Sequence, residues 1–242
     1  MHLFTSTVDD YCNHPISEFP APIRAFRSLV IGVLWVFGKV MWRCDFERKE
    51  LIAGQGGGTG SVIICNHTSM AEVVVIYTEL KRMGRSVRPI AKSEFYKNKL
   101  IAWAFSRVGA ISVERGTADI KSLRAAQHAL KRGEDILIFP EGTRVRSDDQ
   151  PAPIHGGFAL IAQMAKAPIA PMAVCGFRDI TPAGKKLMRP KKCWIRVGDA
   201  VSASDAPGDL KRRDRARWVE DEALRRMFAL RDQLRDEHPG RF

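Results

Sequence analysis

Short apolar runs alternate with amphipathic stretches along most of the chain. The runs have the length and composition of buried β-strands and lie at residues 61–65, 87–91, 110–113, 135–139, 169–174 and 194–197. The amphipathic stretches between them predict helices near residues 69–83, 98–107, 118–131 and 157–166. Strands that alternate with helices pair in parallel, carry helices on the sheet, and present ligand sites at their carboxyl ends. The pattern predicts one α/β domain with a mostly parallel sheet flanked by helices.

The N-terminal region has a different pattern. Residues 29–38 contain no polar side chain, and Arg and Lys flank them within residues 24–43. A membrane span needs about 20 apolar residues, so this run is too short to cross a bilayer. Its tryptophans, Trp35 and Trp42, and its basic flanks favour a helix lying in the membrane interface, with an internal core helix as the alternative. We therefore expect residues 1–45 to associate with a membrane.

The C-terminal region predicts one more helix. Apolar residues recur every three or four positions from Val219 to Leu234, with charged residues between them. We expect this amphipathic helix, within residues 206–242, to close the core of a main α/β unit at residues 46–205. The glycine-rich stretch at 54–60 precedes a strand instead of following one, so it predicts a turn and no nucleotide site.

Charge and cysteine content narrow the class of protein. The chain has 242 residues, a formal net charge of +12, and 5 Cys without a CxxC pair. Scattered cysteines in odd number indicate a reducing compartment, and no basic leader with a small-residue cleavage site precedes the apolar run, so we expect the protein to stay inside the cell. The basic excess suits an anionic membrane, a phosphorylated substrate or a nucleic acid. With only 3 Tyr and no zinc-finger spacing, a nucleic-acid-binding module is the least favoured of these.

The first candidate for chemistry is the segment from Asn66 to Glu72, at a strand-to-helix junction. His67 and Glu72 could form a general base, in which the carboxylate orients the imidazole and stabilises the imidazolium. Ser69 and Glu72 also have the spacing of a helix capping box, which would give Glu72 a purely structural role. The residues alone leave both interpretations open.

Two further segments follow predicted strands. Residues 139–144 read Phe-Pro-Glu-Gly-Thr-Arg, where Arg144 and the Gly142 and Thr143 amides could cradle a phosphate, or simply form a surface turn. Residues 109–115 would bring Arg115 to the carboxyl end of a strand, although one Arg alone is weak evidence.

These blocks together resemble the phospholipid/glycerol acyltransferase family, over about residues 60–180. Asn66-His67-x4-Glu72 resembles the family's Asn-His-x4-Asp block, and Phe139 to Arg144 is identical to its Phe-Pro-Glu-Gly-Thr-Arg block. Residues 109–115 are similar to its glycine-to-arginine acceptor block, and 167–171 to its proline block. Lys92 resembles a basic position between the first two blocks.

The resemblance implies direct acyl transfer, and we expect the apolar segment within residues 24–43 to hold the enzyme on the cytoplasmic face of the membrane. His67, oriented by Glu72, would deprotonate the hydroxyl of a lysophospholipid, which attacks the thioester of acyl-CoA or acyl carrier protein. Substrate would be held by Lys92, Arg115, Glu141, Gly142, Thr143 and Arg144. No metal or cofactor is expected, and the partners would be membrane phospholipid and the two substrates, with no nucleic acid.

The identity of the acceptor depends on departures from the family pattern. Glu72 replaces the usual Asp, and Ser112 stands where an aromatic residue is common. The resemblance favours 1-acylglycerol-3-phosphate as acceptor, but the Ser112 change leaves another lyso-lipid, such as lyso-ornithine lipid, as an alternative.

Overall fold

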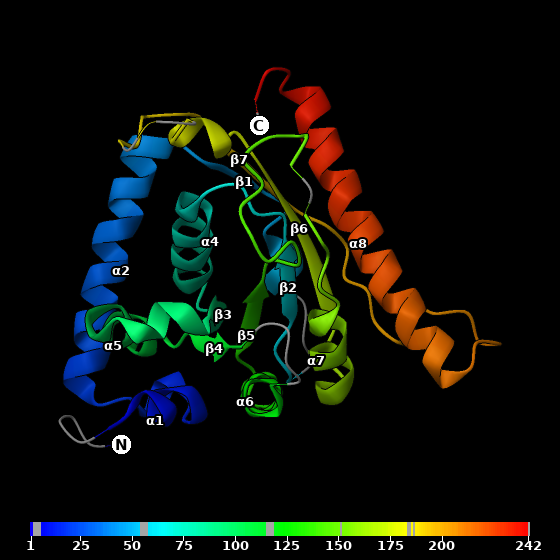
Figure 1. Ribbon diagram of the computed structural model, residues 1–242, viewed down its shortest axis with the longest axis horizontal. Helices are drawn as coiled ribbons and strands as arrows, with labels where there is room; N and C mark the ends of the chain where they lie inside the picture. The colour runs from blue at the N-terminus through cyan, green and yellow to red at the C-terminus, as the bar shows by residue number, and fades with distance from the viewer. Residues whose placement is uncertain are drawn as a thin grey trace.

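A parallel sheet forms the centre of the molecule (Figure 1). The computed structural model describes residues 1, 6–53, 58–114, 119–150, 152–182, 185 and 187–241. Within these residues the sheet has seven strands in the order β1-β7-β6-β2-β5-β3-β4. The strands are β1 (Asp45–Glu47), β2 (Val62–Cys65), β3 (Val87–Lys92), β4 (Ile111–Val113), β5 (Asp135–Ile138), β6 (Ile169–Cys175) and β7 (Trp194–Val197). Neighbouring strands pair in parallel except β6 and β7, which are antiparallel.

Helices cover both faces of the sheet. They are α1 (Val8–Asn13), α2 (Ala21–Trp42), α3 (Glu50–Ala53), α4 (Met70–Arg82), α5 (Lys99–Val108), α6 (Ile120–Lys131), α7 (Gly157–Ala165) and α8 (Arg212–Glu237), with 3-10 turns η1 (Ile16–Glu18), η2 (Ser93–Lys97) and η3 (Arg178–Ile180). One apolar cluster joins α2 and α4 to one face of the sheet, and another joins α6, α7 and α8 to the opposite face. Figure 1 shows α2 and α4 on the left of the sheet and α7 and α8 on its right.

The predicted fold class is confirmed. Each predicted strand and helix is present within a few residues of its expected bounds, and the C-terminal helix, Arg212–Glu237, lies within residues 206–242 as expected. The pattern missed α1, α3 and β1, which are too short to show a period. Residues 54–57 of the predicted glycine turn lie outside the described residues.

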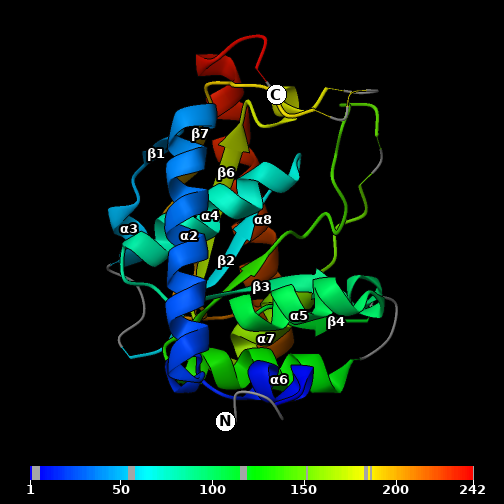
Figure 2. The ribbon, with the colours of Figure 1, turned by 90° about the vertical axis from the view of Figure 1, so that its left-hand side faces the viewer.

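The length expected of the N-terminal apolar element was wrong. The sequence run covers ten residues, but α2 continues on both sides of it as one helix of 22 residues. By length and mean hydropathy, α2 is the one helix among the described residues that could cross a membrane. The helix is longer than the run because Pro20 and Pro22 start it upstream and the flanking residues are good helix formers. Figure 2 shows α2 as a straight helix in front of α4.

A buried arginine fastens the N-terminal segment to the sheet. Arg88 of β3 is fully buried, and its guanidinium donates to Glu134 at 2.8 Å and to the carbonyl oxygens of Tyr11 and Cys12. Glu134 also accepts the backbone N–H of Ile16 at 2.8 Å. These contacts hold α1 and η1 against the amino end of the sheet.

Candidate active site

His67 and Glu72 meet at the carboxyl end of β2. The strand is fully buried and ends at Cys65, and the short loop after it leads to Ser69, the N-cap of α4. His67 Nδ1 lies 2.5 Å from Glu72 Oε1. A carboxylate only accepts hydrogen bonds, so Nδ1 carries the proton and Nε2 keeps a free lone pair. This tautomer makes Nε2 the basic nitrogen.

Glu72 is both the partner of His67 and the cap of α4. The side chain is fully buried, and its oxygens also accept from Thr68 N at 2.7 Å, Thr68 Oγ1 at 2.8 Å and Ser69 N at 3.0 Å. Ser69 completes the capping box by accepting from Ala71 N at 3.2 Å. The structural and chemical interpretations of Glu72 are therefore not alternatives, because one carboxylate makes both sets of contacts.

The loop after β5 holds the backbone and the ring of His67. The Glu141 carboxylate accepts the backbone N–H of His67 at 2.5 Å, and Val145 N donates to His67 O at 2.7 Å. The Phe139 ring stacks on the imidazole with centroids 4.3 Å apart. Since Phe139 and Glu141 belong to the Phe-Pro-Glu-Gly-Thr-Arg block, this block positions the histidine block.

Burial affects the Glu141 carboxyl. Removal from water raises its pKa, the His67 amide opposes this rise, and the Glu72 charge adds to it. The carboxylate accepts from a backbone amide, so in this structure Glu141 positions the His67 backbone.

The turn itself differs from the expected phosphate cradle. Gly142 N donates to Phe139 O at 2.9 Å, and Thr143 N donates to Glu141 O at 2.7 Å. Gly142 has a φ of 62°, which glycine adopts without strain. The two amides are thus engaged inside the turn, which leaves the Thr143 hydroxyl and the half-buried Arg144 side chain as its candidate phosphate contacts.

Asn66 fixes the end of β2 to the next strand. Its side chain donates to Val174 O at 3.2 Å and accepts from Val174 N at 2.8 Å. This role of Asn66 was not predicted from the sequence, since its partner lies 108 residues away.

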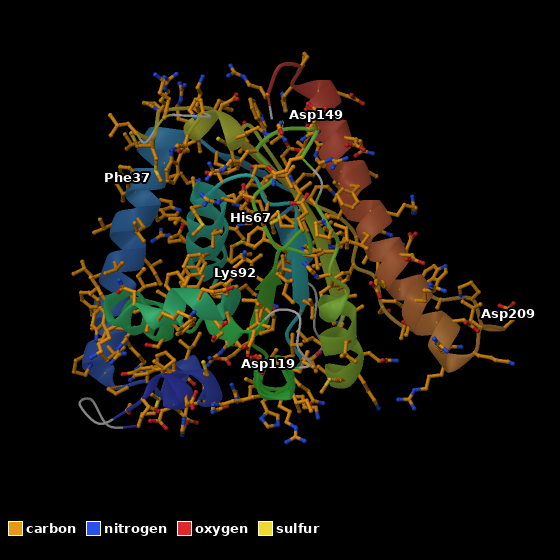
Figure 3. All side chains as sticks on the ribbon, viewed as in Figure 1. Phe37, His67, Lys92, Asp119, Asp149 and Asp209 are labelled. Atoms are coloured by element: carbon orange, nitrogen blue, oxygen red, sulfur yellow. The ribbon has the colours of Figure 1, made fainter. Side chains whose placement is uncertain are left out.

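Lys92 ends β3 at the same edge of the sheet (Figure 3). The register pairs Ile64 with Ile138, and Pro89 with Leu137. β5 thus lies between β2 and β3, and both Lys92 and His67 lie toward the carboxyl edge from these paired residues. β4 ends beside Lys92 at Val113, and Arg115 lies outside the described residues.

Other chemistry finds little support at this edge. No group of three His, Cys, Asp or Glu side chains within the described ranges is placed to hold a metal ion. Burial raises the pKa of the Cys65 thiol, which makes it a poor nucleophile.

Comparisons with known proteins agree with the geometry. A family model described as "Acyltransferase" matches residues 43–175. The chain is 31% identical to the 1-acyl-sn-glycerol-3-phosphate acyltransferase of Bacillus subtilis (strain 168) over 147 residues, which are 61% of this chain and 69% of that protein. It is 26% identical to a lyso-ornithine lipid O-acyltransferase of Pseudomonas aeruginosa over 61% of this chain and 55% of that protein. It spans less than half the length of the plant chloroplast relatives that it also matches.

The fold has a solved counterpart. The crystal structure of the 1-acyl-sn-glycerophosphate (LPA) acyltransferase PlsC from Thermotoga maritima superposes with a TM-score of 0.60 at 22% identity, covering 88% of this chain and 85% of that chain. The residues that the family model matches include β2, the His67 loop and the turn after β5. The chain belongs to the acyltransferase family.

Proposed function

We propose that this protein transfers a fatty acyl group from acyl-CoA or acyl carrier protein to the hydroxyl of a lysophospholipid, with 1-acylglycerol-3-phosphate as the favoured acceptor. The observation that carries the proposal is the 2.5 Å contact between His67 Nδ1 and the buried Glu72, in a chain of the acyltransferase family.

The reaction needs one proton transfer in each direction. His67 Nε2 takes the proton of the acceptor hydroxyl as its oxygen bonds to the thioester carbonyl carbon. Glu72 stabilises the imidazolium that forms. The C–S bond then breaks, and the leaving thiolate takes the proton from Nε2, which restores the enzyme without a covalent acyl intermediate.

Basic and hydroxyl groups beside His67 would hold the acceptor. Lys92 ends β3, and Thr143 and Arg144 follow β5, which is the neighbour of the strand that leads to His67. Charge-assisted contacts from such groups to a phosphate position the hydroxyl near Nε2. Arg115 keeps its predicted role in this set. Glu141 would position His67 instead of touching the acceptor, because its carboxylate binds the His67 amide.

A second acceptor class is favoured by one relative and one residue. The Pseudomonas aeruginosa relative carries the name lyso-ornithine lipid O-acyltransferase. Ser112, the middle residue of β4, departs from the aromatic residue common in the family's acceptor block. A lyso-ornithine lipid acceptor would be held without a phosphate.

The exposed face of α2 supports a site on the membrane surface. Val33, Val36 and Val40 share one face and are 60%, 55% and 70% exposed. The opposite side is joined to α4 by Arg27, which donates to Tyr77 Oη at 2.7 Å, and by Lys39, which pairs with Glu79 at 2.6 Å. A helix fastened to the body at both ends of its length lies along the membrane interface instead of leaving the body to cross it. We place the protein on the cytoplasmic face.

The test is an acceptor and donor panel with purified protein in vesicles. Lysophosphatidic acid with labelled acyl-CoA should give labelled phosphatidic acid, and His67→Ala should abolish it. Arg144→Ala should lower acceptor kcat/KM by about 10- to 150-fold, the effect of about 1.5 to 3 kcal/mol for a charged hydrogen bond. Arg146→Ala, an exposed arginine of the same loop, is the control. Product from lyso-ornithine lipid but not from lysophosphatidic acid would replace the favoured acceptor, and no transfer to any lyso-lipid would refute the proposal.

A further inference from the structure

A cavity of about 370 Å³ lies at the carboxyl edge of the sheet, against the C-terminal half of α8. Thr68 and Glu141, which belong to the network around His67 and Glu72, form part of its wall. Open α/β sheets bind ligands at this edge. No sequence pattern predicts the cavity, because its α8 residues have the spacing of an ordinary solvated helix face.

Three arginines line the cavity from two separate elements. Arg178 comes from η3, and Arg231 and Arg235 lie one turn apart on α8; their side chains are 14%, 26% and 24% exposed. Each guanidinium is therefore mostly withdrawn from water, although it remains open to the cavity.

An acidic side chain of this chain marks the place for an anion. Asp148 accepts from Arg178 at 3.1 Å and from Arg235 at 3.2 Å, and these contacts hold the pKa of its carboxyl below the usual range. The Asp148 side chain is 54% exposed and belongs to a surface loop, so it can leave the arginines. A phosphate would complement the same fork with more oxygens and more charge.

The rest of the cavity suits an uncharged, flexible arm. Val145, Ala152 and Phe228 contribute apolar surface, and Asn66 and Gln150, whose amides are bonded to nearby backbone groups, contribute neutral polar surface. Lys92 and Arg144, the groups assigned to the acceptor phosphate, are absent from its described lining. An anion site beside a mixed apolar and amide wall, with Thr68 and Glu141 at the His67 loop, fits a phosphorylated pantetheine arm.

We propose that this cavity binds the phosphate and pantetheine arm of the acyl donor, which brings the thioester to His67 from the α8 side. The inference rests on the proposed function, since it names the donor's site for the same reaction. Acyl-CoA and acyl carrier protein share this arm and its phosphate linkage, so the cavity recognises a chemistry common to both.

The first test is equilibrium binding, which needs no turnover. Displacement of fluorescently labelled CoA should show that 4′-phosphopantetheine binds the wild-type protein about tenfold or more tighter than pantetheine, as expected for charged hydrogen bonds. The ratio should fall close to one in the double variant Arg231→Gln/Arg235→Gln. Arg225→Gln is the matched control, because Arg225 is on the same helix, is exposed and is paired with Glu222. A wild-type ratio near one, or an unchanged ratio in a double variant of normal melting temperature, overturns the proposal.

Asp148→Asn gives a change of the opposite sign. It removes the competing carboxylate from Arg178 and Arg235, so phosphopantetheine should bind several-fold tighter. Weaker binding of phosphopantetheine in this variant would contradict the inference that Asp148 and the phosphate occupy the same position. This test does not depend on whether the Arg231→Gln/Arg235→Gln variant folds.

Steady-state kinetics identify the source of the phosphate. In Arg231→Gln/Arg235→Gln the KM for acyl-CoA, and for acyl carrier protein in a parallel arm, should rise about tenfold while the acceptor KM stays constant. A raised acceptor KM with a constant donor KM would assign the cavity to the acceptor and overturn the proposal. Absence of acyl transfer with every lyso-lipid would instead refute the proposed function, while the binding ratio would still report on the cavity.

Discussion

The Glu72 carboxylate is shared among four donors. Oε1 faces His67 Nδ1 and Thr68 N, and Oε2 faces Thr68 Oγ1 and Ser69 N. Replacing one oxygen with an amide NH₂ group would place a donor against donors, whichever way the amide is turned. A glutamine at position 72 would therefore affect both the helix start and the imidazole.

We expect Glu72→Gln to lower turnover about 10²-fold or more, since it removes the negative charge that stabilises the imidazolium. It should also lower the melting temperature, since it leaves a hydrogen-bond donor unpaired. Glu72→Asp should retain substantial activity. Ser69→Ala is the matched control, because it removes the cap on Ala71 N, worth about 1 kcal/mol, while the carboxylate stays. Glu72→Gln should therefore lower both the melting temperature and kcat, whereas Ser69→Ala should lower only the melting temperature. Near-normal turnover in Glu72→Gln would show that Glu72 only caps α4.

Glu141 should make stability depend on pH. Burial raises its pKa, so the folded state binds its proton more readily than the unfolded state, and this contribution to stability is lost as the pH rises through the raised value. Glu141→Gln keeps an oxygen for the His67 amide but has no proton to lose. The melting temperature of this variant relative to wild type should therefore increase as the pH rises from the ordinary carboxyl value of 4.5 through the raised value. A melting-temperature difference that stays constant or decreases over this range would contradict a raised pKa of Glu141.

Glu141→Ala distinguishes positioning from charge. It removes the acceptor of the buried His67 N–H, at a cost of about 1 to 3 kcal/mol, whereas Glu141→Gln retains it. We expect kcat to fall in the alanine variant and to stay within about tenfold of wild type in the glutamine variant.

Among the elements, α2 and α1 are both N-terminal but are held by different contacts. α2 packs on α4, whereas α1 and η1 depend on the buried Arg88 and Glu134. Deleting both together would remove the proposed membrane face and also the Tyr11 and Cys12 carbonyl partners of Arg88. Point variants on the outer face of α2 therefore test the membrane contact more cleanly.

Val33→Glu/Val40→Glu should release the protein from vesicles. Each valine contributes about 1.5 kcal/mol on burial, so two substitutions should lower the partition coefficient about 10²-fold. Glutamate favours helices at least as well as valine, so the fold should survive. Leu160→Glu, on α7 across the sheet and 45% exposed in the wild type, is the control in sedimentation with anionic vesicles. Unchanged pelleting of the double variant would assign membrane binding to another surface.

Arg88→Met should destabilise the protein by up to about 3 kcal/mol, because Glu134 would keep its charge in a buried site with only the partly exposed Arg132 as an ion-pair partner. Chemical denaturation measures the loss, and hydrogen exchange should show early opening at residues 8–19. Arg88→Met/Glu134→Gln should recover part of the stability, and no recovery would show that the carbonyl contacts of Arg88 matter more than its ion pair.

At the scale of the whole molecule, local pattern predicted the strands, the helices and the junction that carries His67. It could do so because a strand period, a cap and a Gly-Thr turn are encoded within a few residues. Contacts between distant segments had no such signal: Glu141 reaches His67 across 74 residues, and Asn66 reaches Val174 across 108. The same holds for Asp148 and the arginines of η3 and α8, whose charges look evenly solvated until the fold brings them together.

The placement of α2 and α8 on opposite faces of the sheet has a consequence for how concentration acts on the enzyme. With the proposed placement on a membrane surface, the side bearing α2 would adjoin the two-dimensional lipid phase, and the side bearing α8 would adjoin bulk solvent. The acceptor would then be supplied by its mole fraction in the surface, and the donor by its molarity in solution. Diluting the membrane with inert lipid slows such an enzyme even when the total amount of acceptor is constant, so the composition of the bilayer becomes a rate-determining variable in its own right.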